Sequence, residues 1–266
     1  MKNTGVTILV PYDFSQVADY ALQHAIRVSQ VVNQPITLLH IVNGLSDHKL
    51  MQEKLSKVAS QSAARFGLEP IALIKEGSIF VQIAEVAREI NASMVIMGSH
   101  SIRGKEEISG SLAHKVIISS SVPFVTIQEP PINKRYDEII FPIDFTEQNR
   151  EKHSWISYFC TYYVSRFHLI KPYIVDPQLQ CRVDLNMASA RKFLDELGAK
   201  YIEYDVKGEK NYAEEVLEIA VNIRADLIVL MTTPKDNEDK FIVEPHEQFI
   251  IANAGHIPVM SINPTT

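Results

Sequence analysis

The sequence has few cysteines, no long hydrophobic run and no cluster of basic residues. Two cysteines in 266 residues, Cys160 and Cys181, do not make a disulfide framework and are typical of a reducing compartment. No stretch reaches the roughly 18 apolar residues of a membrane-spanning helix. The N-terminus lacks the longer apolar core of a signal peptide. We therefore expect a cytoplasmic protein without membrane contact.

The charge balance argues against a nucleic-acid partner. Lys and Arg total 26 and Asp and Glu total 32, which gives a net charge of −6. Binding to nucleic acid needs clustered positive charge, and this chain offers none. The hydrophobic fraction of 46% is that of a soluble globular protein. At roughly 150 residues per domain, the length indicates two domains.

Three segments of the first half return in the second half in the same order. The spacings are 144 − 13 = 131, 225 − 92 = 133 and 257 − 122 = 135 residues. The matched pairs are Val6–Ser15 with Asp137–Thr146, Ala92–Met97 with Ala225–Leu230, and Val122–Ile127 with Ile257–Ile262. The chain is therefore a tandem repeat. Because the paired prolines 130 and 131 make a stiff linker, we place the domains at residues 1–131 and 132–266.

Each copy alternates short apolar runs with segments of helical spacing. The predicted strands are Thr7–Tyr12, Ile36–Val42, Ile71–Lys75, Met94–Met97, Phe124–Ile127, Glu138–Ile143, Leu169–Val175, Tyr201–Val206, Leu227–Met231 and Val259–Ile262. The predicted helices are Ser15–Val32, Ser78–Ile90, Ser109–Ser119, Glu147–Arg166, Leu179–Leu197, Tyr212–Ile223 and Pro245–Ala254. Nearly continuous apolar strands are typical of sheets covered on both faces. The pattern predicts two doubly wound, Rossmann-like α/β domains, each with a five-stranded parallel sheet.

A glycine-containing loop follows the fourth strand of the first copy. Gly98, Gly104 and Gly110 would let the backbone approach a phosphate, and the following helix would direct N–H groups toward it. His100 and Ser111 would add polar groups beside the phosphate. Ligands of open parallel sheets bind beyond the carboxyl ends of the strands, where this loop begins. The alternative is a surface loop whose glycines only satisfy turn geometry.

The second copy has lost this loop. Residues 230–240 contain no glycine, and Glu244-Pro245-His246 stands where Gly110-Ser111 is expected. Asp144 persists at the position of Asp13. We interpret the second copy as a partner whose nucleotide loop is degenerate.

The combined motifs resemble the universal stress protein family. They are Val10-Pro11-Tyr12-Asp13-Phe14-Ser15, Leu39-His40-Ile41-Val42 and Met97-Gly98-Ser99-His100 with Gly104 and Gly110-Ser111. The likeness covers nearly the whole chain as two units. It implies an adenine-nucleotide α-hydrolase-like fold. Members that bind ATP use a loop of the form Gly-x-x-Gly, nine residues, Gly-Ser/Thr.

The resemblance implies a binding role for a definite set of residues. Asp13 and the main chain of Ile41 would face adenine, with Pro11 and Met97 in the same pocket. The ribose and phosphates would be surrounded by Gly98, His100, Ser101, Gly104, Gly110, Ser111 and Leu112. The chain departs from the motif because Ser101 replaces the second glycine, and eight residues rather than nine separate it from Gly110. Glu106 and Glu107 would place Mg²⁺, although solvation of the loop explains them equally well.

These observations predict a stress-response or regulatory protein that binds ATP or AMP in its first domain. The alternative is an interaction scaffold without a nucleotide, and an enzyme would need a substrate domain that this chain does not offer. No catalytic set and no paired metal-ligand spacing is visible, so at most slow ATP hydrolysis is expected. An unknown protein partner and a homodimer are further candidates. Phe124–Ile127 and Val259–Ile262 would pair in an internal pseudo-dimer.

One segment of the second copy is rich in aromatic residues. Its spacings of three and four predict a core-facing stripe on one helix. The residues are Trp155, Tyr158, Phe159, Tyr162, Tyr163 and Phe167. Their excess over one stripe would pack on the other copy or bind an apolar ligand.

Overall fold

The computed structural model describes residues 6–44, 48–99, 114–234 and 241–264. The chain divides into two units, Met1–Lys134 and Arg135–Thr266. This division lies three residues beyond the boundary predicted from the proline pair. The predicted alternating α/β architecture is confirmed, and each unit is described here by itself.

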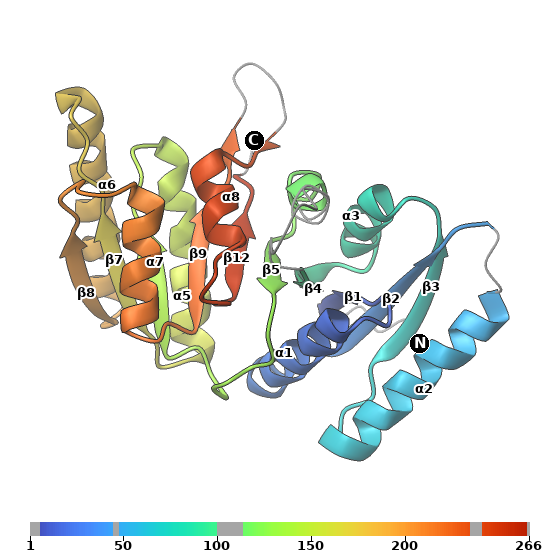
Figure 1. The fold of residues 1–266 in the computed structure, drawn as a ribbon. Helices are drawn as coiled ribbons and strands as arrows, with labels where there is room; N and C mark the ends of the chain where they lie inside the picture. The colour runs from blue at the N-terminus through green and yellow to red at the C-terminus, as the bar shows by residue number, and fades with distance from the viewer. Residues whose placement is uncertain (1–5, 45–47, 100–113, 235–240, 265–266) are drawn as a thin grey trace. The chain divides into compact units, whose positions relative to one another are not determined.

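The first unit is a five-stranded parallel sheet of order β3-β2-β1-β4-β5. Its elements are β1 Thr7–Pro11, α1 Gln16–Val32, β2 Ile36–Val42, α2 His48–Phe66, β3 Ile71–Glu76, α3 Ile79–Glu89, β4 Ala92–Gly98 and β5 Phe124–Ile127. Helices α1 and α2 cover one face of the sheet, and α3 covers the other (Figure 1).

Strand β1 forms the centre of this core. Ile8, Leu9 and Val10 have no exposed surface, because helices cover both faces of the strand. Ser15 caps α1, since its side chain accepts a hydrogen bond from the backbone N–H of Ala18 at 3.3 Å. Asn33 ends the helix in the left-handed conformation, with a φ of 54°.

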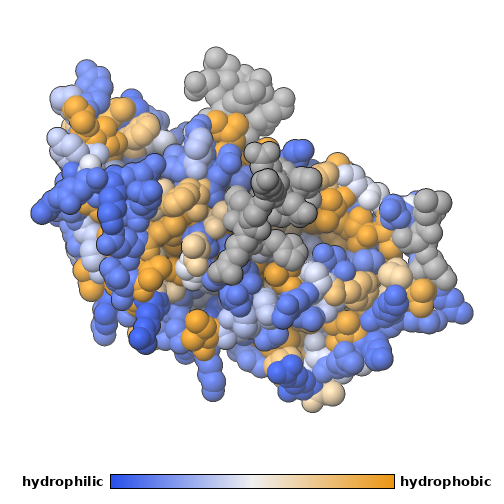
Figure 2. All heavy atoms as spheres, in the orientation of Figure 1, coloured by the Kyte–Doolittle hydropathy of each residue, from blue (hydrophilic) through white to orange (hydrophobic). Residues whose placement is uncertain are grey.

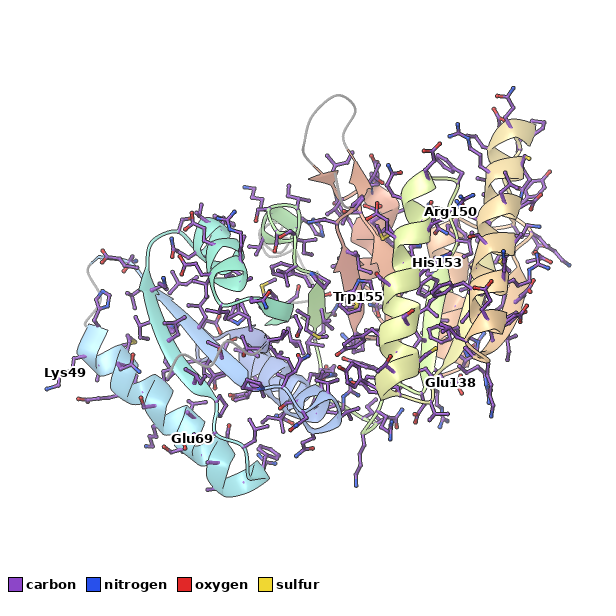
Figure 3. The ribbon with its side chains drawn as sticks, turned by 180° about the vertical axis from the view of Figure 1, so that it is seen from behind. Lys49, Glu69, Glu138, Arg150, His153 and Trp155 are labelled. Carbon is purple, nitrogen blue, oxygen red and sulfur yellow. The ribbon has the colours of Figure 1, made fainter. Side chains whose placement is uncertain are left out.

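The second unit repeats the sheet in the order β8-β7-β6-β9-β12. Its elements are β6 Glu138–Pro142, the 3₁₀ helix η1 Glu147–Lys152, α5 His153–Tyr162, β7 Arg166–Lys171, α6 Pro177–Glu196, β8 Lys200–Asp205, α7 Tyr212–Asn222, β9 Leu227–Met231, β10 Thr233–Pro234, β11 Phe241–Ile242, α8 Pro245–Ile251 and β12 Val259–Ile262. The view from behind shows α5 and α6 over one face (Figure 3), and Figure 1 shows α7 and α8 over the other.

Three sequence-based expectations about the helices and strands of the two units were wrong. Strand β7 is Arg166–Lys171 rather than the predicted Leu169–Val175, and it ends earlier because Pro172 has no N–H to continue the ladder. The single helix predicted over Glu147–Arg166 is a 3₁₀ helix followed by α5. Helix α2 was not among the predicted helices, because it buries only a narrow stripe of Leu55, Ala59 and Ser62.

The aromatic segment is divided between two elements rather than lying on one helix. Helix α5 ends at Tyr162, so Phe167 belongs to β7, where it is buried. Phe159 has the predicted core position, with only 1% of its surface exposed. Trp155 and His153 lie on the same helix (Figure 3), and His153 stacks on Phe193 of α6 with ring centroids 4.7 Å apart.

The face of the protein seen in Figure 2 is largely polar. Hydrophilic residues cover much of the face seen in Figure 2, with apolar residues scattered among them. Among the described residues, no helix combines the length and the apolar character needed to cross a membrane. The predicted pairing of Phe124–Ile127 with Val259–Ile262 stays a prediction.

Candidate functional site

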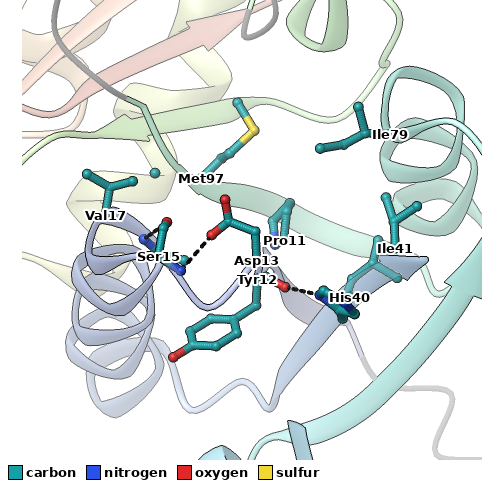
Figure 4. A pocket seen from close by; sticks show the side chains of 12 residues that line it. Pro11, Tyr12, Asp13, Ser15, Val17, His40, Ile41, Ile79 and Met97 are labelled. Atoms are coloured by element: carbon teal, nitrogen blue, oxygen red, sulfur yellow. Dashed lines mark hydrogen bonds between the residues drawn. The ribbon is translucent and has the colours of Figure 1, made fainter. Parts of the chain in front are cut away.

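A pocket of about 130 Å³ lies at the carboxyl ends of β1, β2 and β4 in the first unit. This is the edge at which open parallel sheets bind ligands. Five residues predicted for the site line it together, namely Pro11, Asp13, Ile41, Met97 and Gly98 (Figure 4). The other six, His100, Ser101, Gly104, Gly110, Ser111 and Leu112, lie outside the described residues.

Asp13 supplies the carboxylate of this pocket. Its Oδ1 accepts a hydrogen bond from the backbone N–H of Ser15 at 2.9 Å, which shapes the turn between β1 and α1. The side chain is exposed, and Figure 4 shows its carboxylate beside Met97, on the side of Ser15. The carboxylate therefore keeps acceptor capacity for a ligand while it supports the turn.

His40 lines the pocket, and Phe14 packs on His40, although the sequence reasoning assigned neither to the site. The Nδ1 of His40 donates to the carbonyl of Tyr12 at 2.7 Å, since a carbonyl can only accept. The Phe14 ring packs on His40 with centroids 4.7 Å apart. Phe14 has a φ of 66°, an unusual conformation for a bulky side chain and one that often marks a functional turn.

Tyr12 ties this turn to the first helix. Its hydroxyl donates to the carboxylate of Asp19 on α1. Burial of the hydroxyl, followed by its hydrogen bond to Asp19, raises the pKa of Tyr12. The phenol is therefore a neutral donor throughout the physiological pH range, and it holds the strand end against α1.

Gly98 has a packing role beside its predicted role near a phosphate. A Cβ at this position would lie 2.5 Å from the carbonyl oxygen of Val17 and 3.0 Å from the N of Ala18. The end of β4 can therefore meet the start of α1 only with glycine at position 98. This close approach sets the floor of the pocket.

Seven more residues line the pocket without having been predicted. They are Tyr12, Ser15, Val17, Ala18, Leu39, His40 and Ile79. Six of them lie within two residues of a predicted residue or in the first turn of α1, so the sequence around the strand ends could have indicated them. Ile79 begins α3 and reaches the pocket only through the tertiary fold.

The second unit also has a pocket at its strand ends. The cavity measures about 290 Å³ and lies beyond β6 and β9. Tyr212, the first residue of α7, corresponds to Ile79, the first residue of α3. The Tyr212 hydroxyl donates to the carbonyl of Ile170 at 2.8 Å and to that of Ile143 at 3.1 Å. Its ring therefore extends over the ends of β6 and β7, where the first unit has the smaller Ile79.

Charged side chains are buried in this second pocket. Lys152 is 1% exposed, and its Nζ donates to the carbonyl of Pro142 at 2.6 Å and lies 3.6 Å from Oδ2 of Asp144. Burial lowers the pKa of Lys152, and the neighbouring Asp144 opposes that shift. Burial raises the pKa of Glu247 to about 7. Neither of these buried groups was assigned to a site from the sequence.

No metal centre is apparent in the part of the chain that the structure describes. Within residues 6–44, 48–99, 114–234 and 241–264, no three His, Cys, Asp or Glu side chains are grouped as metal ligands require. The two described cysteines are free, with Cys160 half-buried and Cys181 exposed.

The two doubly wound sheets make the chain an α/β protein with a pocket at the strand ends of each sheet. Residues 6–128 match the model of the universal stress protein family. A universal stress protein of Methanocaldococcus jannaschii is 26% identical over 145 residues, covering 48% of this chain and 85% of that protein. The first unit therefore carries a universal stress protein domain.

Solved structures extend the likeness in fold to both units. A universal stress protein from Archaeoglobus fulgidus DSM 4304 superposes with a TM-score of 0.77 at 16% identity and covers 99% of both chains. A functionally unknown protein from Pseudomonas aeruginosa PAO1 gives a TM-score of 0.69 at 13% identity, over 98% of this chain and 94% of that one. The tandem arrangement is thus shared with solved structures of similar length.

Proposed function

We propose that the protein is a stress-response or regulatory protein that binds ATP or AMP in its first unit. The observation that carries the proposal is the strand-end pocket of a universal stress protein domain, with apolar walls and one exposed carboxylate. Small-molecule sites commonly combine apolar walls with a few placed polar groups.

The described walls suit the adenine end of a nucleotide. Pro11, Ile41 and Ile79 offer apolar surface for a flat heterocycle, and Met97 adds a polarizable thioether. Asp13 would accept hydrogen bonds from amino or hydroxyl groups of the ligand. The phosphates would extend toward the glycines that follow Gly98, with Mg²⁺ as a candidate companion.

The second unit would bind no nucleotide in this proposal. Tyr212 lies across the strand ends that Ile79 leaves free, and the sequence between Met231 and Glu244 contains no glycine. One nucleotide per chain is therefore expected. Binding rather than turnover would be the activity, because the sequence contains no recognisable catalytic set.

The test is to denature freshly purified protein and identify the released nucleotide by chromatography and mass spectrometry. Titration of Mg-ATP in a calorimeter gives the affinity and the stoichiometry. About one ATP or AMP per chain supports the proposal. An empty protein without a calorimetric signal would instead favour the interaction scaffold, in which Ser101 has ended nucleotide binding.

Two substitutions at one position separate binding from folding. Asp13→Ala removes both the ligand acceptor and the bond to the Ser15 N–H. Asp13→Asn keeps an oxygen for that turn but removes the charge. Both variants should weaken Mg-ATP binding by about tenfold or more, since hydrogen bonds to charged groups contribute about 1.5–3 kcal/mol. Unchanged affinity in Asp13→Ala would remove the pocket from the proposal.

A further inference from the structure

Three titratable side chains of the second unit form a continuous hydrogen-bonded chain outside its pocket. His168 of β7 is 1% exposed, and its Nε2 lies 2.6 Å from Oε2 of Glu138 on β6. The Nδ1 of His168 lies 3.0 Å from the hydroxyl of Tyr204 on β8. None of the three residues lines the pocket at the strand ends. The proposed nucleotide function therefore gives this cluster no role.

The strand register places the three side chains on one face of the sheet. His168 pairs with Ile202, two residues before Tyr204. It also pairs with Ile140, two residues after Glu138. Side chains two residues apart on a strand point to the same face. Because Ile202 is 40% exposed and Tyr204 is half-buried, a reagent in solution can approach the phenol while the imidazole behind it stays covered.

The carboxylate of Glu138 fixes the position of the imidazole proton. A carboxylate only accepts hydrogen bonds, so in neutral His168 the proton lies on Nε2 and Nδ1 is an acceptor. The Tyr204 hydroxyl then donates to Nδ1. Arg166 lies 3.6 Å from Oε1, the other oxygen of Glu138, and balances its charge. A hydroxyl, a base and a carboxylate that orients the base form the arrangement by which proteins activate nucleophiles.

The first unit builds the same part of its sheet without titratable groups. The strand registers give the counterparts of Glu138, His168 and Tyr204 as Thr7, Thr37 and Leu73. The two threonine hydroxyls lie 3.2 Å apart. Neither a threonine nor a leucine side chain removes a proton near neutral pH. The fold therefore does not require an acid–base chain at these positions.

Tyr204 does not offer a free phenolate to a reagent. Burial, followed by the nearby charge of Glu138, raises the pKa of Tyr204, so the phenol is neutral near pH 7. An unassisted phenol of this kind would react more slowly than an exposed tyrosine. A high reactivity of Tyr204 must therefore come from removal of its proton by His168.

We propose that Tyr204 is a nucleophile that accepts an acyl group from an activated ester or thioester, with His168 as its general base. The phenolic oxygen attacks the acyl carbon, the bond from that carbon to the leaving oxygen or sulfur breaks, and an aryl ester forms on Tyr204. The phenol proton passes to Nδ1 of His168 and from there to the leaving group. Glu138 is a positioning residue, because it holds the imidazole through Nε2 and stabilises its charge. This modification site lies outside both pockets and goes beyond the proposed function.

The test is acetylation of the full chain by p-nitrophenyl acetate at pH 8, followed by peptide mass spectrometry. Tyr173, which is 62% exposed, is the control within the same sample. A general base contributes about 10²–10⁴-fold, so Tyr204 should be acetylated at least about tenfold faster than Tyr173. Equal rates, or a faster reaction at Tyr173, would overturn the proposal.

A variant of the base separates activation from exposure. His168→Phe keeps a ring beside Tyr204 but cannot take a proton, so acetylation of Tyr204 should slow by at least about tenfold while that of Tyr173 is unchanged. Circular dichroism establishes whether the variant is folded. A folded His168→Phe protein with the wild-type rate would contradict the proposal. If the variant does not fold, the rates at Tyr204 and Tyr173 in the wild type still decide.

A matched pair of Glu→Gln variants tests the positioning role of Glu138. Glu138→Gln removes the charge that keeps the proton on Nε2, so ¹⁵N NMR of His168 should show a larger share of the Nδ1–H tautomer, and Tyr204 should react about tenfold more slowly. Glu203→Gln changes the exposed carboxylate that precedes Tyr204 on β8 and should retain the wild-type tautomer and rate. An unchanged tautomer and rate in Glu138→Gln would overturn the assignment of Glu138.

Discussion

The two pockets lie at equivalent strand ends, yet different residues close them. In the first unit Ile79 begins the third helix and leaves the ends of β1 and β2 open to a ligand. In the second unit Tyr212 begins the corresponding helix and bonds to the carbonyls of Ile143 and Ile170. The second cavity is the larger, about 290 against 130 Å³. We therefore propose that the residue at the start of this helix, rather than the size of the cavity, decides which pocket accepts a nucleotide.

A second difference concerns the floor of the pockets. Gly98 ends β4 directly against the start of α1, whereas Met231 occupies the corresponding place at the end of β9. The second unit begins its first helical segment as a 3₁₀ helix, and this segment places Lys152 in the pocket. The second unit thus has Met231 in place of the glycine and a charged side chain, Lys152, in its pocket.

The largest loss of stability is expected from Gly98→Ala. The added methyl would lie 2.5 Å from the Val17 carbonyl oxygen, so strand and helix must separate, at a cost of about 3 kcal/mol. Gly67→Ala is the control, because Gly67 has a φ of 69° but no atom within 4 Å of the added Cβ. It should cost about 1 kcal/mol. Urea denaturation followed by circular dichroism measures both, and equal losses would contradict the packing role of Gly98.

Rising pH should weaken the second unit through Glu247. Its pKa is 4.5 in the unfolded chain and about 7 in the fold, so the folded state retains the proton longer. The stabilisation that protonated Glu247 contributes is fully present below pH 4.5. As the pH rises through 7, the free energy of unfolding falls by about 3 kcal/mol. Trp155, the one tryptophan of the chain, reports unfolding of this unit by fluorescence. Glu247→Gln should flatten the profile; a profile unchanged by this variant would refute the assignment.

Falling pH should weaken the first unit through His24. Burial and the nearby Arg27 lower the His24 pKa from 6.5 to about 3, and the ring Nε2 donates to the Glu129 carbonyl at 3.0 Å. The unfolded chain binds a proton below pH 6.5 while the fold does not. The contribution of neutral His24 to the free energy of unfolding is therefore fully present above pH 6.5. It falls by about 2 kcal/mol when the pH reaches 5.

The exposed His48 provides the control for this prediction. The free energy of unfolding is measured by urea denaturation with circular dichroism at pH 7 and pH 5. In His48→Gln it should fall between these pH values as in the wild type, whereas in His24→Gln it should fall less. An identical acid dependence in the two variants would show that His24 is not its source.

The smallest effect is expected from Tyr212→Phe. The variant removes the donor to two strand-end carbonyls and keeps the ring, so it should cost about 1 kcal/mol. Tyr201→Phe removes an exposed bond to Asp195 and should cost less. Trp155 fluorescence in urea measures both variants. A larger loss from Tyr201→Phe would argue against an anchoring role for the Tyr212 hydroxyl.

Much of the fold could be predicted from the sequence, because buried strands are short apolar runs. The limits predicted for β2, β5, β9 and β12 agree with the structure. The limits of β7 could not be derived from apolar runs alone. Apolar residues occur before Pro172, at Leu169 and Ile170, and after it, from Tyr173 to Val175. Helix α2 was missed because one narrow buried stripe gives little periodic signal.

The site was less accessible to sequence reasoning than the fold. Pro11 and Gly98 end strands and Asp13 follows one, so the motifs could place them at the strand ends. Ile79 and Tyr212 could not, because their contact with the pocket depends on where α3 and α7 begin relative to the sheets. The contact of Gly98 with Val17 depends likewise on tertiary packing.

The most direct test of the account is a calorimetric titration of Mg-ATP into the wild type and Ile79→Tyr. Ile79 is 45% exposed, so the substitution should leave the fold intact while placing in the first pocket the side chain that covers the second. The account predicts one ATP per chain for the wild type and no measurable binding for Ile79→Tyr. Two ATP per chain, no binding by the wild type, or equal affinity in the variant would contradict it.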